Sequence, residues 1–220
     1  MLLVLPTIGS LFLAGFTSEE TGVLSIGATS RVVTDPDIGP IIFNTVVYAT
    51  ISSIMAIGLG TYFALITERT NIPLRRLFAV LIIAPMAVPW FLGPFSWIFL
   101  LDPKIGLVNL WIQSIFGMST GPFSIYGLPG MIWVTGTGFS FGYLLLASAF
   151  QNMDPAYEES ARISGARMPT IFYKITMRLM LPAIFSVFLI EFVRVLEFLD
   201  SALILGYKRA YLSSRQGSGL

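Results

Sequence analysis

Long apolar runs separated by short polar segments dominate this chain. Two of these runs, 41–66 and 77–101, contain no charged residue. A helix needs about 20 apolar residues to cross the hydrocarbon core of a bilayer, and both runs are longer than that. The pattern therefore predicts two membrane-spanning helices joined by a short polar loop at 67–76.

A third uncharged tract, 105–153, is too long for a single span. It is interrupted at 117–130 by a segment rich in Gly, Pro and Ser, which is typical of a loop. We expect a short helix at 105–116, in which Trp111 suits the membrane interface, and a full span at 131–150. This tract therefore predicts one interfacial helix and one membrane span.

Each end of the chain adds a further apolar stretch. Residues 179–206 predict another span. Residues 2–16 have no preceding basic residue and no clear cleavage site of a signal peptide, so we interpret them as a clipped first span. The expected fold class is an all-α membrane protein with about five spans, truncated before a sixth.

Composition supports the membrane class and narrows the chemistry. Hydrophobic residues make up 55% and charged residues 11% of the 220 residues, and the mean hydropathy is +0.81. A soluble domain is near half apolar and a quarter charged. The net charge of +1 creates no field that would recruit nucleic acid. Because Cys and His are absent, we expect no thiol or histidine catalysis, no metal site and no cofactor.

Basic residues indicate how the spans are oriented, because short loops rich in Lys and Arg stay in the cytoplasm. Loop 67–76 carries three arginines and segment 151–182 carries four basic residues, so both are predicted to be cytoplasmic. Segments 17–40 and 102–130 carry one basic residue each and are predicted to lie outside. The tail 207–220 would also lie outside, yet it carries three basic residues, which truncation would explain.

Segment 151–182 has helical signals of its own. Asp154 suits the N-cap of a helix whose first residue is Pro155. Gly165 suits the end of that helix, because glycine adopts a left-handed conformation at little cost. Pro169 can then start a second helix. The segment therefore predicts a helix, a sharp turn and a second helix, a shape that presents a surface to a cytoplasmic partner.

The first of these helices carries its charges in a favourable order. Glu158 and Glu159 lie near the positive end of the helix. Each lies three or four residues before Arg162, so each is placed to pair with that arginine.

Five residues of this segment follow a recognisable spacing: Glu159, Ser160, Ala161, Gly165 and Ile175. They resemble the EAA loop of ATP-binding-cassette importer permeases, in which E-A-A, three residues, G, nine residues and I-x-L-P follow one another. Ser160 stands where Ala is usual, and Met177 and Arg178 stand where Leu and the first Pro are usual. Pro182 keeps a later proline that is common in the family.

The resemblance covers about 41–206 and implies a type-1 importer transmembrane fold in the inner membrane of a bacterium. It implies that the loop at 151–182 docks on a cytoplasmic ATP-binding-cassette ATPase, so that the chain itself is not an enzyme. An external solute-binding protein and a second permease subunit or half are the other implied partners. The expected domains are 1–40, a partial span with an external loop, then 41–206, the transmembrane domain, and 207–220, an atypical tail.

The first half of the larger permeases that serve ferric-iron and similar systems is the most similar part of the family. That similarity makes ferric iron the expected substrate. Three alternatives stay open: a permease fragment that cannot assemble, a passive channel, and an intramembrane enzyme that uses the carboxylates of the fifth stretch.

Four charged residues follow one another at intervals of three inside that stretch: Glu191, Arg194, Glu197 and Asp200. A charge near the bilayer centre costs about 2.5 to 3.5 kcal/mol, so such residues usually have a partner or a function. Arg194 is placed to pair with both Glu191 and Glu197. The pattern fits a structural ion-pair cluster and a lining of the translocation path equally well.

Prolines and small residues predict how the spans bend and pack. Pro85, Pro89 and Pro94, with Gly93, interrupt the span at 77–101, and we interpret it as an ordinary kinked span rather than a substrate route. Two sets of small residues repeat at a spacing of four and predict close helix contacts: Ser52, Ala56 and Gly60, and separately Gly138 and Gly142.

Overall fold

The fold is taken from a computed structural model, which describes residues 35–36, 38–197 and 204–205. The clipped span at 2–16, Asp200 and the tail 207–220 lie outside these described residues. The chain divides into two compact units, Met1–Val46 and Val47–Leu220. In the first unit the described part is the start of one helix, where the Thr45 hydroxyl donates to the carbonyl of Ile41 at 2.9 Å.

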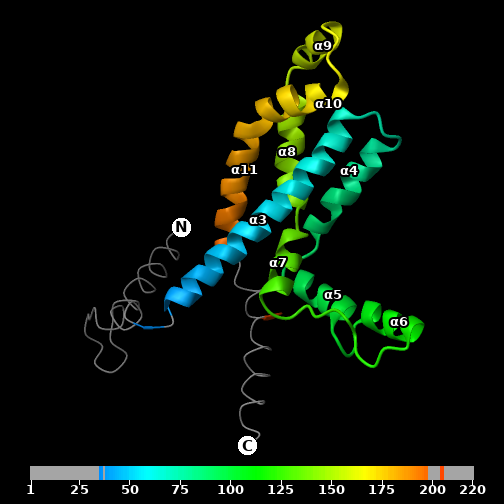
Figure 1. Cartoon of the computed structure of the whole chain (residues 1–220), viewed down its shortest axis with the longest axis vertical. Helices are drawn as coiled ribbons and strands as arrows, with labels where there is room; N and C mark the ends of the chain where they lie inside the picture. Colours follow the sequence, from blue (N-terminus) through cyan, green and yellow to red (C-terminus); the bar gives the residue numbers. More distant parts are fainter. Residues whose placement is uncertain (1–34, 37, 198–203, 206–220) are drawn as a thin grey trace, which may run out of the picture. The chain divides into compact units, whose positions relative to one another are not determined.

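The regular secondary structure of the second unit is all helical within its described residues (Figure 1). The elements up to the middle of the chain are α3 (Ile38–Arg69), α4 (Arg75–Ile83), η1 (Ala84–Ala87), α5 (Leu92–Leu101) and α6 (Leu107–Phe116). Those after it are α7 (Leu128–Gly136), α8 (Ser140–Asn152), α9 (Ala156–Ile163), α10 (Met168–Ile171), the π-helix η2 (Phe172–Thr176) and α11 (Met177–Glu197). The expectation of an all-α membrane protein is confirmed for this part of the chain.

Three helical stretches are long and apolar enough to cross a membrane, namely Ile38–Arg69, Leu128–Asn152 and Met168–Glu197. The second of them contains a short break at 137–139, between α7 and α8. The first two coincide with the spans predicted at 41–66 and 131–150. The third begins earlier than the predicted 179–206, because α10, η2 and α11 follow one another without a break. The second helix of the predicted cytoplasmic segment is therefore the beginning of the following span.

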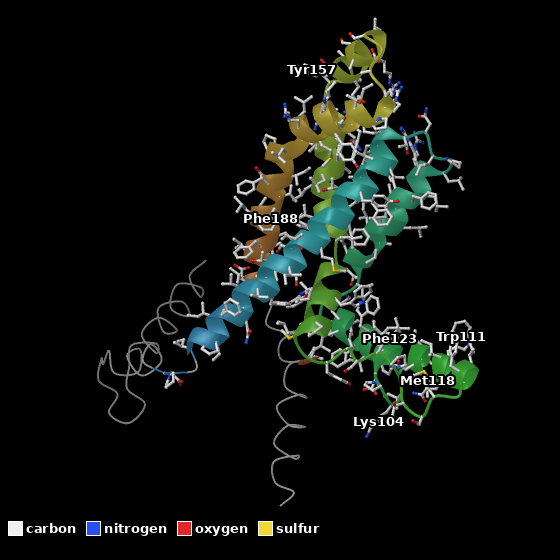
Figure 2. The ribbon with its side chains drawn as sticks, viewed as in Figure 1. Lys104, Trp111, Met118, Phe123, Tyr157 and Phe188 are labelled. Carbon is white, nitrogen blue, oxygen red and sulfur yellow. The ribbon has the colours of Figure 1, made fainter. Side chains whose placement is uncertain are left out.

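The predicted single span at 77–101 is wrong in one respect. Its two halves, Arg75–Ala87 and Leu92–Leu101, meet at an angle of 106°, so they form a broken span or a re-entrant loop. A proline removes a backbone donor and clashes with the preceding turn. Four irregular residues separate the halves, and Pro89 is one of them. The predicted short helix at 105–116 is confirmed as α6, which carries Trp111 (Figure 2).

The core of the second unit lies between α3, α8 and α11. Its buried residues are Ile57, Ala64, Tyr143, Leu146, Ala147, Phe150, Met180 and Val187. The hydroxyls of Thr67 and Tyr143 share a hydrogen bond of 3.1 Å inside this core, which ties α3 to α8. The bond joins the last turn of α3 to a tyrosine in the first turn of α8.

Small residues bring α3 and α8 into close contact, as predicted for Ala56, Gly60 and Gly142. Ser52 is buried on the same helix as Ala56 and Gly60. A Cβ atom on Gly60 would lie 2.9 Å from the backbone nitrogen of Tyr143, and one on Gly142 would lie 3.1 Å from Cδ1 of Ile57. Gly138 does not take part in this contact. It lies in the break between α7 and α8, where its nearest neighbour is the carbonyl oxygen of Thr135 in the same turn.

A buried amide organises the segment between α5 and α7. The side chain of Asn109 donates to the carbonyls of Leu101, Asp102 and Phe123 at 2.9 to 3.1 Å and accepts from the Phe123 amide at 3.1 Å. Figure 2 shows Phe123 beside α6, on the loop that follows it. The loop predicted at 117–130 is therefore pinned to α5 and α6.

Candidate functional site

The helix and turn predicted in segment 151–182 are present. The Asp154 side chain accepts a hydrogen bond from the Ala156 amide at 2.9 Å, at the start of α9. Gly165 adopts the left-handed conformation with φ of 79°. The Ala166 amide donates to the Ala161 carbonyl at 3.0 Å, and the Gly165 amide donates to the Arg162 carbonyl at 2.9 Å. These two bonds form a Schellman motif, which ends a helix and satisfies its last carbonyls.

Most residues of the expected docking motif face outward. Glu159, Ser160 and Gly165 are exposed, whereas Ala161 and Ile175 are half-buried. Large apolar side chains are exposed on the same hairpin, among them Tyr157, Ile163, Met168 and Tyr173 (Figure 2 labels Tyr157). Ile163 is 88% exposed. Large exposed apolar patches are typical of surfaces that contact another protein or a membrane.

The expected pairing with Arg162 is wrong for Glu158. Its carboxylate points to Arg69 at the end of α3, with 3.7 Å between Nη1 and Oε2, and accepts from the Thr176 hydroxyl at 2.6 Å. Within the described residues neither Glu158 nor Glu159 forms an ion pair with Arg162. Sequence spacing within one helix favoured Arg162, but the fold places a cation from another helix beside Glu158.

A cavity of about 680 Å³ lies among the broken helices and α11. The break after α4 and the helix α5 contribute one wall, which includes Pro85, Pro89, Trp90, Pro94 and Trp97. The break between α7 and α8 contributes a second wall, which includes Thr135, Thr137, Gly138 and Phe141. The third wall is the end of α11, with Glu191, Arg194 and Glu197. The prolines and the intramembrane charges therefore line one space.

Inside this cavity the predicted ion pair is present in part. Arg194 Nη1 lies 2.9 Å from Oε2 of Glu191, and the Arg194 guanidinium lies 4.1 Å from the centre of the Phe141 ring. Glu191 is 6% exposed and Arg194 is 44% exposed, so the arginine reaches from a buried partner into the cavity. In the described part of the chain Glu197 forms no salt bridge with Arg194. The ion pair of Glu191 and Arg194 therefore forms part of the wall of the cavity.

Sequence reasoning did not single out Arg69, Thr176, Asn109 or Phe141. Arg69 was noted as one of several loop cations, and the other three carry no local signal. Their partners lie between 7 residues away, for Asn109 and Asp102, and 89 residues away, for Arg69 and Glu158. No spacing rule reports such contacts. Across the described residues no three His, Cys, Asp or Glu side chains lie close enough together to hold a metal ion.

Comparison with known proteins identifies the family. The model of the binding-protein-dependent transport system inner membrane component matches residues 56–218. The maltose/maltodextrin transport system permease protein MalF of Vibrio parahaemolyticus is 29% identical over 143 residues, covering 62% of this chain and 27% of MalF. The permease protein FbpB 1 of Haemophilus influenzae, whose name assigns it to ferric transport, is 25% identical over 205 residues, covering 93% of this chain and 32% of that protein.

The fold agrees with that of a solved transporter. A chain of a bacterial transporter involved in the import of the acidic polysaccharide alginate superimposes with a TM-score of 0.71 at 19% identity, covering 92% of this chain and 71% of that chain. The present chain spans about a third of the length of the curated relatives it matches, between 27% and 36% for the first three. The family model matches most of the chain, and three helical stretches are long enough to cross a membrane. The chain therefore belongs to the binding-protein-dependent transport system inner membrane components, the multi-pass permeases of ATP-binding-cassette importers.

Proposed function

We propose that this chain forms part of the translocation path of an ATP-driven importer and that the hairpin of α9 and α10 docks on a cytoplasmic ATPase. The observation that carries this proposal is the exposed hairpin, with Glu159 on its outer face and a Schellman turn at Gly165, in a member of this family. An external solute-binding protein delivers the solute, and a second permease subunit or half completes the path.

The chemistry of the hairpin fits a protein partner. Its apolar side chains supply buried area on contact, and the exposed carboxylate of Glu159 near the start of α9 supplies a charge that fixes orientation. Closure of the ATPase pair on ATP would displace this hairpin and tip the attached helices between outward-open and inward-open states. Such rigid-body switching needs a hairpin that moves as one piece with its helices.

The cavity lined by Glu191, Arg194 and Glu197 is the proposed route of the solute. Its walls combine aromatic rings, hydroxyls and charged groups, which suits a polar solute. Broken helices often surround the substrate site of transporters, because their irregular backbone lines a cavity. The names of the relatives include maltodextrin, galactooligosaccharide and ferric transport, so ferric iron stays a prediction.

The docking proposal is tested by purifying the tagged chain in detergent from native membranes. The variant Glu159→Lys reverses the charge on the outer face of α9, whereas Gln151→Lys places a lysine at the same end of the molecule but on α8. We expect an ATPase to co-purify with the wild type and with Gln151→Lys, and the amount recovered with Glu159→Lys to fall about tenfold or more.

Two results would count against the proposal. Equal recovery of the ATPase with both variants would mean that the outer face of α9 is not the docking surface. Absence of an ATPase from the wild-type preparation would favour a fragment that inserts without assembling. Ion flux through the purified chain without ATP would instead support the passive channel.

A further inference from the structure

Arg69, at the end of α3, holds three other elements at once. Its Nη2 atom donates to the carbonyl of Phe150 at 2.7 Å and to the carbonyl of Met153 at 2.8 Å. Its Nη1 atom lies 3.7 Å from a carboxylate oxygen of Glu158 on α9. The second carboxylate oxygen of Glu158 accepts from the hydroxyl of Thr176 at 2.6 Å. One chain of contacts therefore joins α3, the end of α8, α9 and η2.

These contacts are shielded from solvent. The side chains of Arg69 and Glu158 are each 15% exposed, and Thr176 is 3% exposed. Charge-assisted hydrogen bonds of this length are stronger than those between neutral groups, and shielding reduces their screening by salt. At the end of α8 the Phe150 carbonyl accepts from the Met153 amide at 3.3 Å as well as from Arg69. The guanidinium therefore adds a donor at the end of the helix, where a cation also complements the helix dipole.

α9 has less apolar packing than the second helix of the hairpin, α10, in which Ile171 is buried. No residue of α9 is buried, so the helix has little apolar surface that would fix its position. Glu158 and Glu159 are neighbours in sequence but lie about 100° apart around the helix. Glu158 faces the protein and is held, whereas Glu159 is exposed on the outer side. Glu158 therefore contacts the rest of the protein, whereas Glu159 is open to solvent.

We propose that Arg69, Glu158 and Thr176 are positioning residues that transmit movement of the docked hairpin to α3, α8 and η2, and through η2 to α11. The inference rests on the proposed function, because it assigns to these residues the coupling of ATP hydrolysis to opening of the path. Docking itself belongs to the outer face of the hairpin. When the link is broken, the ATPase should stay bound, but ATP hydrolysis should no longer open the path efficiently.

The coupling is measured in proteoliposomes that contain the full complex. In Arg69→Gln the guanidinium is lost, and in Thr176→Val the hydroxyl is lost with little change in shape, whereas Thr176→Ser keeps the hydroxyl. We expect both loss variants to retain the ATPase within about twofold, while transport per ATP hydrolysed falls about tenfold. Thr176→Ser should couple like the wild type. Valine matches threonine in size and serine is smaller, so this result would assign the effect to the hydroxyl and not to side-chain size.

A second measurement needs no ATPase. Because the chain contains no cysteine, spin labels can be placed at Ile163→Cys on α9 and Leu77→Cys on α4, both exposed positions. We expect a narrow distribution of label distances in the otherwise wild-type chain and in Thr176→Ser, and a broader one in Arg69→Gln and Thr176→Val. The broadening would show that the link positions the hairpin.

The outcomes separate the two proposals. If both loss variants transport with wild-type coupling, or if their label distances stay as narrow as those of the wild type, the link has no positioning role. If Arg69→Gln fails to accumulate, the Thr176→Val and Thr176→Ser pair still decides. If the wild type binds no ATPase, the proposed function fails, while the label distances still show whether these residues hold the hairpin.

Discussion

Gly60 lies where α3 and α8 approach most closely. A Cβ atom at this position would come within 2.9 Å of the Tyr143 nitrogen and 3.2 Å of the Gly142 carbonyl carbon, and both are backbone atoms that cannot rotate away. Gly58, two residues earlier on the same helix, has nothing within 4 Å of the equivalent position. Both glycines lie in the same helix, but only Gly60 of the two packs closely against another helix.

We predict that Gly60→Ala destabilises the protein by about 1 to 3 kcal/mol, because overpacking forces the two helices apart. Gly58→Ala should be neutral or slightly stabilising, since alanine favours a helix over glycine. Thermal unfolding in detergent, followed by retention of a monodisperse size-exclusion peak, measures the difference. Equal melting temperatures for the two variants would contradict the close approach of α3 and α8.

Asn109 shows what residue types alone do not reveal. The sequence predicts the helix around it correctly, but nothing at neighbouring positions distinguishes this asparagine from a solvent-exposed one. In the structure it is fully buried and its amide bonds to three carbonyls and one amide. Those partners include Phe123, 14 residues away, and only the folded chain brings them together.

At the scale of elements, the helical hairpin of segment 151–182 was predictable because its signals are local. Asp154, Pro155, Gly165 and Pro169 each act on the backbone within a few residues, and the structure has a cap, a left-handed glycine and a second helix in those places. The limit of this local reasoning is the far end of the hairpin. There α10 continues through η2 into α11 instead of ending.

Gly165 provides a test of the hairpin turn. A side chain would meet no atom within 4 Å, so steric crowding by neighbours is not the issue. The left-handed backbone costs a non-glycine residue roughly 1 to 2 kcal/mol. We predict that Gly165→Ala makes local opening of the turn about tenfold more frequent, whereas Gly165→Asn is milder, because asparagine tolerates this conformation.

Hydrogen exchange measures this effect at the Gly165 and Ala166 amides, which donate the two bonds of the turn. Exchange of the Tyr143 amide, which bonds to Phe139 within α8, serves as an internal reference. Unchanged protection of Ala166 in Gly165→Ala would mean that the turn does not depend on the left-handed glycine.

The bent helix pair at 75–101 shows a second limit of what local sequence signals can predict. Pro85, Pro89 and Pro94 indicated interruption, and we interpreted them as an ordinary kink. The two halves are bent by 106°, and the second half, α5, contacts α6 and α7. Such a choice between a kinked span and a broken one depends on neighbouring helices, so proline positions cannot decide it.

At the scale of the molecule, the arrangement of the second unit agrees with the predicted alternation of loops. Figure 1 shows α9 and α10 at the end of the helices where α3 ends and α4 begins, and α5 and α6 at the other end. The bonds from Arg69 to Phe150 and Met153 join the loops 67–76 and 151–182 directly. Both arginine-rich loops therefore lie at one end, as the charge rule requires.

We predict that this end faces the cytoplasm. Single cysteines at Asn71 and at Met118, both exposed, can be labelled with a membrane-impermeant maleimide because the chain has no cysteine of its own. In intact spheroplasts Met118→Cys should react and Asn71→Cys should react only after lysis. Reaction of both, or the reverse order, would show that the orientation derived from the basic residues is wrong.

The sequence by itself determined the membrane class, the positions of two spans, the helix and turn around Gly165 and the family. These follow from hydrophobicity, backbone preferences and a spaced motif, all of which act over short distances along the chain. Only the tertiary structure decided that the prolines and the charges at Glu191 and Arg194 line one cavity, and that Glu158 pairs with Arg69 instead of Arg162. Those contacts join helices far apart in sequence, and their geometry exists only after the helices have packed.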